Sequence, residues 1–225
     1  MEKSFNVKIL KKDKITYDTR RFSVTKPKNY RFISGQATDI AINLNDYTEK
    51  KRPFSFTSIN ESPNLEFIIK IYKERNSVTK KLSELKEGDE LIIREPFGSI
   101  RYFDRGVFIA GGTGITPFIS IFRQLKKENK LKGNTLIFSN KTEKDIILKD
   151  ELDKMSKEGL KCIYLITEEN NPKYYNEYIN ENFLKNKIKD FSQHFYVCGP
   201  VRFVGEIQHI LQKLGAKPDR IIVET

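Results

Sequence analysis

Gly111-Gly112-Thr113-Gly114-Ile115-Thr116-Pro117 is the stretch that decides the fold of this chain. It directly follows the apolar run GVFIA at 106–110 and opens an amphipathic run that continues to Glu128. A strand, a glycine-rich turn and a helix in this order can hold a phosphate against backbone N–H groups and the positive end of the helix. Glycine permits the close approach and the positive φ that this needs, and Pro117 suits a first helical turn. A turn that merely tolerates glycine is the alternative interpretation.

The chain that follows this loop alternates between apolar, strand-like runs and helix-like runs. Such alternation predicts right-handed crossovers and a parallel sheet covered by helices on both faces. Ligands of these sheets lie at the carboxyl ends of the strands, where Gly111 and Gly199 fall. The expected strands are 107–110, 135–138, 162–166, 195–198 and 221–223, and the expected helices are 117–128, 145–156, 174–184 and 202–214.

The chain before the loop consists mostly of short strand-like runs that are separated by turn signals. These runs are 5–10, 19–25, 36–43, 53–58, 65–72 and 90–94. Their number and spacing predict a closed or nearly closed antiparallel barrel. One helix is expected at 79–85, capped by the Thr79 hydroxyl and ended near Gly88. The sequence therefore predicts two domains, a β-barrel at 1–104 and an α/β domain at 105–225.

The composition excludes several kinds of site. The 225 residues include two cysteines and two histidines, which are too few for a four-thiolate iron–sulfur centre or a Cys/His zinc cluster. No metal is expected, and a redox reaction would need a bound organic cofactor. No apolar run reaches the roughly 18 residues of a membrane span, and residues 1–5 contain no signal-peptide core. We therefore expect a cytoplasmic protein.

The charge of the chain is strongly positive. Lysine and arginine outnumber aspartate and glutamate by 41 to 30, so the formal net charge is +11. This charge favours an acidic protein, an anionic membrane or a nucleic acid as a partner. The basic residues are interspersed with acidic ones, as in KKE at 126–128 and KTEKD at 141–145. Since there is no long basic block, a nucleic-acid partner is not expected.

Arg52-Pro53-Phe54-Ser55 begins one of the expected barrel strands. An arginine offers bidentate contacts to a phosphate, an aromatic ring offers a stacking surface, and a hydroxyl can donate to a heterocyclic nitrogen. A core phenylalanine beside a surface arginine is the alternative interpretation of this motif.

With these residues the chain resembles the ferredoxin–NADP reductase superfamily, whose flavin domain carries Arg-x-Tyr/Phe-Ser/Thr. Residues 111–117 match the nicotinamide-dinucleotide loop of that superfamily, and Cys198-Gly199-Pro200 matches the motif beneath the nicotinamide. Lys70, Tyr72 and the stretch NKTEKDI at 140–146 are similar to the cytochrome b5 reductase branch. The motifs occur in family order along nearly the whole chain.

The resemblance implies a flavin site on the barrel. Arg52 would bind the FAD pyrophosphate, Pro53 and Phe54 would pack against the cofactor, and Ser55 would hydrogen-bond near the reactive N5. The strand Ile68-Ile69-Lys70 would run beside the cofactor. Ser77, Val78 and Thr79 would donate to the pyrophosphate, as expected at the N-terminus of a helix. A plain N-cap is the alternative role for Thr79.

The resemblance also implies a nicotinamide site on the α/β domain. Gly111, Gly112, Thr113 and Gly114 would bind the dinucleotide, and Thr116 would lie near the flavin, between the domains. Cys198, Gly199 and Pro200 would shape the nicotinamide pocket, without Cys198 acting as a covalent nucleophile. A buried structural cysteine is the alternative.

The chain departs from the family pattern after Pro200 and at its C-terminal end, and a candidate carboxylate lies near that end. Val201-Arg202-Phe203 replaces the common Pro-x-Met. Glu224 is a candidate active-site carboxylate, with a surface glutamate at a strand end as the alternative. Residues 221–225 resemble the plant-type ending, in which a final tyrosine follows the threonine and stacks on the flavin. That tyrosine has no counterpart after Thr225, so the flavin face would be open or covered by another group.

The coenzyme preference depends on residues after the second and third strands of the α/β domain. Glu168 and Glu169 would repel the 2′-phosphate of NADPH and accept hydrogen bonds from free ribose hydroxyls. Lys141 would favour that phosphate. We expect a preference for NADH, with NADPH as the alternative.

These inferences together predict a flavoprotein reductase. NADH or NADPH would reduce FAD, and the electrons would pass to a separate, acidic carrier such as ferredoxin or flavodoxin. A reductase of free flavin or of a small oxidant, without a protein carrier, is one alternative. A basic nucleic-acid-binding barrel is the other, and it leaves the second half of the chain unexplained.

Overall fold

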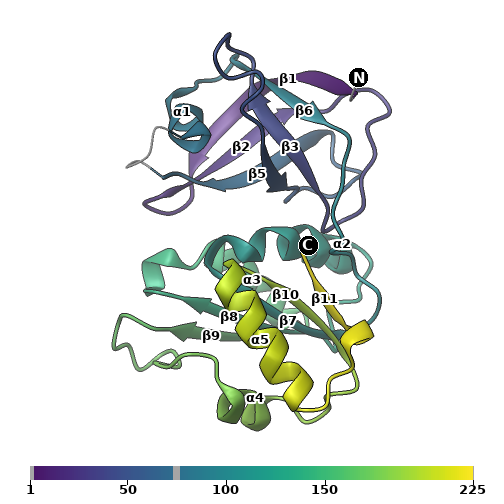
Figure 1. Ribbon diagram of the computed structural model, residues 1–225, viewed down its shortest axis with the longest axis vertical. Helices are drawn as coiled ribbons and strands as arrows, with labels where there is room; N and C mark the ends of the chain where they lie inside the picture. The colour runs from purple at the N-terminus through teal and green to yellow at the C-terminus, as the bar shows by residue number, and fades with distance from the viewer. Residues whose placement is uncertain (1–2, 73–76, 225) are drawn as a thin grey trace.

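The computed structural model describes residues 3–72 and 77–224. The first half of the chain forms an antiparallel sheet of six strands in the order β4-β3-β6-β1-β2-β5 (Figure 1). An isolated antiparallel bridge from Phe56, just after β4, to Phe67 of β5 joins the two edges. The sheet therefore nearly closes on itself, and the expected barrel is confirmed. Its strands are β1 (Ser4–Lys14), β2 (Thr19–Thr25), β3 (Ala37–Ile42), β4 (Arg52–Ser55), β5 (Asn64–Lys70) and β6 (Glu90–Arg94).

The interior of the barrel is aromatic. Phe22, Phe56 and Phe67 are fully buried, and the ring of Phe32 stacks on Phe56 with 4.1 Å between the ring centroids. Strand β2 buries every third or second residue from Thr19 to Val24. The alternation of apolar and polar residues thus places one face of each strand in the core.

The second half of the chain forms a parallel sheet in the order β11-β10-β7-β8-β9. One core cluster joins this sheet to the helices α2 and α3, and a second joins it to α4 and α5. Helices therefore cover both faces, as expected. The strands are β7 (Gly106–Gly111), β8 (Thr135–Asn140), β9 (Lys161–Ile166), β10 (His194–Cys198) and β11 (Ile221–Val223), and the helices are α2 (Thr116–Lys127), α3 (Lys149–Lys157), α4 (Glu181–Lys187) and α5 (Val201–Lys213).

The expected cap of the barrel helix was wrong. Helix α1 (Val78–Glu84) begins after Ser77, whose hydroxyl accepts the N–H of Lys80. Thr79 lies inside the helix, where its hydroxyl oxygen accepts the N–H of Tyr72 at 3.2 Å. Thr79 therefore joins the helix to the end of β5 and does not cap it.

Two helices of the α/β half begin later than expected. The turn η2 (Glu143–Asp145) closes a capping box between Thr142 and Asp145, and Leu148 has a left-handed backbone with φ of 53°. Helix α3 consequently begins at Lys149 and not at 145. Helix α4 begins at Glu181 and not at 174, because Tyr175 forms a parallel bridge to Leu165 of β9.

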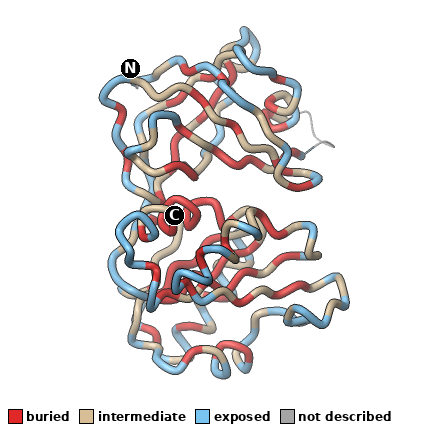
Figure 2. Tube along the Cα trace, turned by 180° about the vertical axis from the view of Figure 1, so that it is seen from behind, coloured by how far each residue is buried: buried red, intermediate tan, exposed pale blue. Residues whose placement is uncertain are grey.

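Helix α2 lies between the barrel and the parallel sheet (Figure 1). Its Ser120 hydroxyl donates to the carbonyl oxygen of Ser58, just after β4, at 2.7 Å. Figure 2 shows the buried residues concentrated in the strands of both halves and in this helix. No helix within the described ranges is long and apolar enough to cross a membrane.

Candidate active site

The glycine loop is packed tightly against the end of a neighbouring strand. Strand β7 ends at Gly111, and the turn η1 (Gly112–Ile115) leads into α2 with Pro117 in its first turn. Gly112 has a φ of 52°. A Cβ on Gly114 would lie 2.2 Å from the carbonyl oxygen of Cys198, so only glycine fits there. The fold therefore brings two expected site motifs, 111–117 and 198–200, into contact.

An aromatic ring lies over the same strand ends. A Cβ on Gly199 would lie 2.8 Å from Cδ1 of Phe203, and one on Gly111 would lie 3.2 Å from that ring. Phe203 belongs to the first turn of α5, where the family pattern has methionine. The ring thus forms a wall of the site, a role that the sequence signalled only as a departure from Pro-x-Met.

A pocket of about 280 Å³ connects this wall to the barrel. Asp18, Lys70 and Tyr72 of the barrel line it, together with Gly112, Thr113, Asn140, Lys141, Pro200 and Phe203 of the α/β half. The pocket lies at the carboxyl ends of β7, β8 and β10, where the fold predicts a ligand. A hollow of about 350 Å³ beside α2, lined by Ile33 and Leu125, contains none of the expected site residues.

Both lysines of the pocket are paired with carboxylates. The Lys70 ammonium lies 2.8 Å from the Asp18 carboxylate, and the Lys141 ammonium lies 2.9 Å from Glu168. Burial alone would lower the pKa of Lys70, but the hydrogen bond to Asp18 and the attraction of its charge together outweigh burial, so that pKa is raised. The hydrogen bond to Glu168 raises the pKa of Lys141 as well. Glu169 is paired with neither lysine in this way. Its carboxylate accepts a hydrogen bond from the backbone N–H of Glu143.

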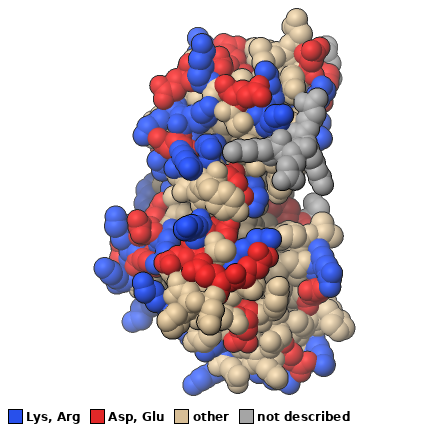
Figure 3. All heavy atoms as spheres, turned by 90° about the vertical axis from the view of Figure 1, so that its left-hand side faces the viewer, with Lys and Arg blue, Asp and Glu red and all other residues tan. Residues whose placement is uncertain are grey.

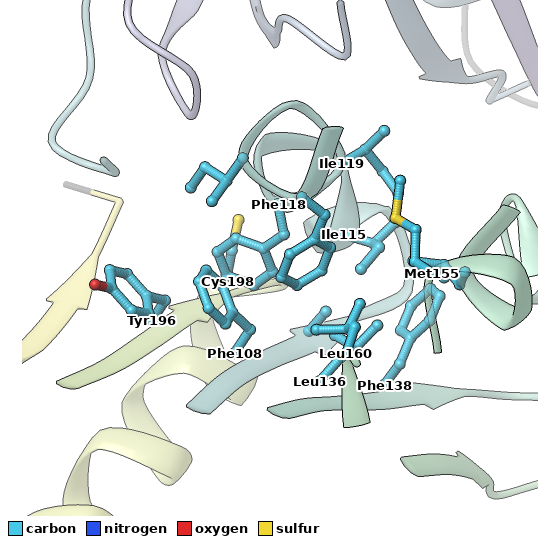
Figure 4. Packing of buried hydrophobic residues seen from close by; sticks show 14 of the residues in the cluster. Phe108, Ile115, Phe118, Ile119, Leu136, Phe138, Met155, Leu160, Tyr196 and Cys198 are labelled. Atoms are coloured by element: carbon cyan, nitrogen blue, oxygen red, sulfur yellow. The ribbon is translucent and has the colours of Figure 1, made fainter. Parts of the chain in front are cut away.

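Cys198 at the end of β10 and Glu224 just after β11 form a polar pair, in which the thiol is buried and the carboxyl is half-buried. The Cys198 thiol donates toward the Glu224 carboxylate across 3.9 Å, and burial raises the pKa of the thiol to about 12. Burial also raises the pKa of Glu224. Figure 4 shows the Cys198 sulfur on the side of the sheet that faces α2, beside Phe118. Glu224 is therefore not the exposed surface residue of the alternative interpretation.

Gly98 and Ser99, in the linker between the halves, pack against the end of the chain that carries Glu224. A Cβ on Gly98 would lie 3.5 Å from Oε1 of Glu224, and the Ser99 hydroxyl donates to the carbonyl oxygen of Val223 at 2.7 Å. The thiol and the carboxyl are thereby enclosed between β10 and the end of the barrel. Thr225, the last residue of the expected plant-type ending, lies outside the described residues.

The expected flavin residues lie on the barrel, and of these Lys70 lines the pocket. Arg52 and Pro53 are exposed on the edge strand β4, and Phe54 and Ser55 are half-buried. Ile68 is buried in the core cluster that contains α2. The hydroxyls of Ser77 and Thr79 lie 3.1 Å apart at the start of α1. The structure thus brings the glycine loop and Cys198 together, while the motif at 52–55 forms β4 and is not among the residues that line the pocket.

Known proteins match both halves of the chain. The profile of the oxidoreductase FAD-binding domain matches residues 6–102, and that of the oxidoreductase NAD-binding domain matches residues 108–209. An NADH-cytochrome b5 reductase 1 of Aspergillus terreus is 30% identical over 218 residues, which cover 87% of this chain and 72% of that protein. The chain belongs to the ferredoxin–NADP reductase superfamily. It is a FAD- and NAD-binding oxidoreductase.

Other members of the superfamily align along most or all of the chain. An NADH-cytochrome b5 reductase 2-A of Vanderwaltozyma polyspora is 28% identical over 238 residues, covering 93% of this reductase and 80% of that protein. The structure of a ferredoxin NADP+ reductase from Neisseria gonorrhoeae, with bound FAD and NADP, superposes with a TM-score of 0.86. It is 22% identical, and the match covers 100% of this chain and 99% of that one. The two proteins share their fold.

The pocket of this reductase has open space at the glycine loop and a buried polar side chain at the end of β8. The glycine loop leaves space above Gly112, where no atom lies within 4 Å of a built Cβ. Asn140 at the end of β8 is 5% exposed, and neither polar atom of its side chain has a hydrogen-bond partner among the described residues. Buried polar groups are normally paired. Asn140 was not among the expected site residues, although a polar residue at the end of a parallel strand was a usable signal.

The barrel surface fits the FAD pyrophosphate in part. Among the described residues the Arg52 guanidinium makes one hydrogen bond, to the carbonyl oxygen of Lys51 at 2.8 Å. Its other N–H groups are available to an anion. Tyr72 is 52% exposed and offers an uncovered ring. The individual roles of Arg52, Phe54, Ser55, Ser77 and Thr79 toward FAD remain predictions.

Proposed function

We propose that this reductase takes hydride from NADH and delivers electrons singly to a separate, acidic carrier protein. The pocket between the barrel and the glycine loop is the observation that carries the proposal, because it joins the two halves at the strand ends. Bound FAD would supply the conversion of a two-electron donor to one-electron transfer. The names of the Aspergillus and Vanderwaltozyma relatives support NADH as the donor and a one-electron carrier as the acceptor.

In this proposal the barrel, residues 1–104, holds FAD, and residues 105–225 hold the nicotinamide dinucleotide. Arg52 neutralises the pyrophosphate, and Ser55 donates a hydrogen bond near the reactive end of the flavin. Cys198 and Glu224 form the closed wall of the nicotinamide side and exclude water from it. The glycine loop holds the dinucleotide by its backbone N–H groups.

The acidic nature of the carrier follows from the charge of the reductase. The formal net charge is +11, and long-range attraction between opposite charges accelerates encounter. On the face shown in Figure 3, Lys and Arg side chains are interspersed with Asp and Glu over both halves. We therefore propose steering by the net charge of the whole molecule. Ferredoxin, flavodoxin and cytochrome b5 all belong to the proposed class of carrier.

The absorption spectrum of the purified protein tests the proposal. We expect a yellow protein with about one FAD per chain, bleached by NADH under anaerobic conditions. Arg52→Ala should weaken FAD binding at least tenfold, because a phosphate charge loses its partner. Arg202→Ala, which changes an exposed arginine on α5, is the matched control and should retain FAD. A colourless protein that fails to bind added FAD would overturn the proposal.

A further inference from the structure

One face of strand β5 runs along the α/β half from a carboxylate to the pocket. Three buried residues of β5 belong to the core of the barrel, at positions 65, 67 and 69. Because successive side chains of a strand point to opposite faces, Glu66, Ile68 and Lys70 share the other face. Ile68 is buried in the core cluster that contains Ile119 of α2, and Lys70 lines the pocket. Glu66 therefore lies at the end of this face that is remote from the pocket.

Helix α2 carries a matching row of polar side chains. Thr116, Ser120 and Arg123 follow one another at spacings of four and three residues, so they lie on one face of the helix. The Ser120 hydroxyl donates to a carbonyl oxygen of the barrel at 2.7 Å, and the Arg123 guanidinium donates to the Glu66 carboxylate at 2.7 Å. Thr116 begins the helix directly after the glycine loop. With a rise of 1.5 Å per residue, Arg123 lies about 10 Å further along the helix.

The Glu66–Arg123 ion pair is held firmly from both sides. Its two side chains are only 20% and 21% exposed. The Thr57 hydroxyl donates to the same oxygen of Glu66 at 2.7 Å, and Glu151 of α3 accepts two hydrogen bonds from Arg123 at 2.6 and 2.8 Å. Each partner is thus fixed within its own half of the molecule. A charge-assisted contact between two fixed groups holds the barrel and α2 at one separation.

We infer that the Glu66–Arg123 ion pair positions the barrel against the glycine loop and thereby sets the rate of hydride transfer in the pocket. This inference rests on the proposed function, because it takes FAD on the barrel and NADH on the loop. The hydride carries two electrons from NADH, which becomes NAD+, to FAD, which becomes its two-electron-reduced anion. A misplacement of about 1 Å can slow such a transfer on the order of 100-fold. Neither Glu66 nor Arg123 is among the described residues that line the pocket, so both are positioning residues.

Anaerobic stopped-flow reduction of the bound flavin by NADH tests the inference. Glu66→Ala should lower the limiting rate at saturating NADH about tenfold or more. The FAD content and the Kd of NADH should stay within about twofold of the wild type, because both binding sites keep their residues.

A second ion pair between α2 and the barrel provides the matched control. Lys127 lies 3.7 Å from Glu61, and these side chains are 51% and 48% exposed. Glu61→Ala should keep the wild-type rate, because an exposed pair contributes little. Glu66→Gln, which keeps the shape of the side chain and a neutral acceptor, should lower the rate by a smaller factor than Glu66→Ala. It serves as the test if the alanine variant does not fold.

The distance between the two halves gives a second measurement, which does not depend on turnover. Nitroxide labels at Glu87→Cys in the barrel and Asn186→Cys in α4, both exposed positions, report this distance by pulsed electron paramagnetic resonance. The labelled protein carries Cys162→Ala, and the native Cys198 is buried. The wild-type background should give one narrow distribution of distances. Glu66→Ala should broaden or shift it, and the matched control should not.

Three outcomes would overturn the inference alone. The first is a wild-type limiting rate in both Glu66 variants, and the second is an unchanged distribution of distances in Glu66→Ala. The third is a loss of rate that is matched by an equal loss of affinity for FAD or NADH, because Glu66 would then shape a binding site. Failure of the wild type to bind FAD or to be reduced by NADH would instead overturn the proposed function, while the distances would still report on the ion pair.

Discussion

At the scale of single residues, Cys198 is expected to act by its place in the wall of the nicotinamide site and not by the chemical reactivity of its thiol. The thiol is 9% exposed and lies 3.9 Å from the Glu224 carboxylate. Cys198→Ser should slow reduction of the bound flavin by NADH about tenfold or more, because a smaller and more polar side chain alters the wall of the nicotinamide site. The FAD content should stay at the wild-type value. Stopped-flow reduction under anaerobic conditions measures the rate, and an unchanged rate would make Cys198 a purely structural residue.

The raised pKa values of the two thiols predict how protein stability and thiol labelling depend on pH. Burial raises the pKa of Cys198 to about 12 and that of Cys162 to about 11, both above the usual value of 9.0. The pKa of each thiol is higher in the folded state than in the unfolded state. The protonated thiols therefore make their full contribution to the free energy of unfolding below pH 9, and this contribution is lost as the pH rises through 11 to 12. At pH 8.5 iodoacetamide should label the native protein slowly and the urea-unfolded protein rapidly. Mass spectrometry measures both rates, and equal rates would contradict the burial of these thiols.

The ion pair between Lys141 and Glu168 governs our prediction on the coenzyme. Because Glu168 neutralises Lys141 at 2.9 Å, the lysine does not present a free cation to the 2′-phosphate of NADPH. The wild type should prefer NADH. Glu168→Gln should shift the ratio of kcat/KM for NADPH over NADH upward by about tenfold. Glu169→Gln is the control, since Glu169 contacts the N–H of Glu143 instead. A wild-type preference for NADPH would mean that Lys141 decides the choice.

At the scale of elements, helix α2 joins the barrel to the α/β half through Arg123, in addition to the Ser120 contact. The Arg123 guanidinium donates to the Thr57 carbonyl oxygen and Glu66 in the barrel, at 2.8 and 2.7 Å. It also makes a bidentate contact to Glu151 of α3, at 2.6 and 2.8 Å. Burial alone would lower the pKa of Arg123, but the bonds to Glu151 and Glu66 outweigh it and raise that pKa. One side chain thus connects three elements.

Removal of this cation should destabilise the protein. Arg123→Met takes the bidentate partner from Glu151 and leaves Glu66 with only the Thr57 hydroxyl and a 4.0 Å contact to Arg21, which costs on the order of 3 kcal/mol. Urea unfolding measures the loss, and Arg202→Met, which breaks an exposed pair with Glu206, should change stability by less than about 1 kcal/mol. If both variants lost equally little free energy of unfolding, Arg123 would not couple the two halves.

At the scale of the whole molecule, the net charge of +11 predicts how reduction of the carrier depends on salt. At 20 mM salt the field extends over roughly 20 Å, and at 200 mM over less than about 10 Å. Reduction of ferredoxin, flavodoxin or cytochrome b5 should therefore fall about tenfold in kcat/KM between these concentrations. Reduction of an uncharged quinone is the control and should change little. Salt-independent reduction of the carrier would contradict an acidic partner, and reduction of small oxidants alone would favour a reductase without a carrier.

Much of the fold follows from local patterns in the sequence. Strands β2, β6 and β11 begin and end at the residues expected from their apolar runs, since each run is bounded by turn residues. The glycine loop is recognisable because Gly112 and Gly114 satisfy local requirements for positive φ and close approach. The late starts of α3 and α4 were missed because nearby side chains, Asp145 and Asn180, cap the chain where the helical pattern had seemed to continue.

Other features were decided by the tertiary structure. The contact of Phe203 with Gly111 and Gly199 requires that β7 and β10 be neighbours, and the Lys141–Glu168 pair requires the same of β8 and β9. Arg123 meets Glu66 only because α2 packs against the barrel. Composition and short motifs determine which residues end a strand, but the order of strands in the sheet determines which of those ends meet. Long-range packing sets that order, and it leaves the Asn140 carboxamide buried without a hydrogen-bond partner among the described residues.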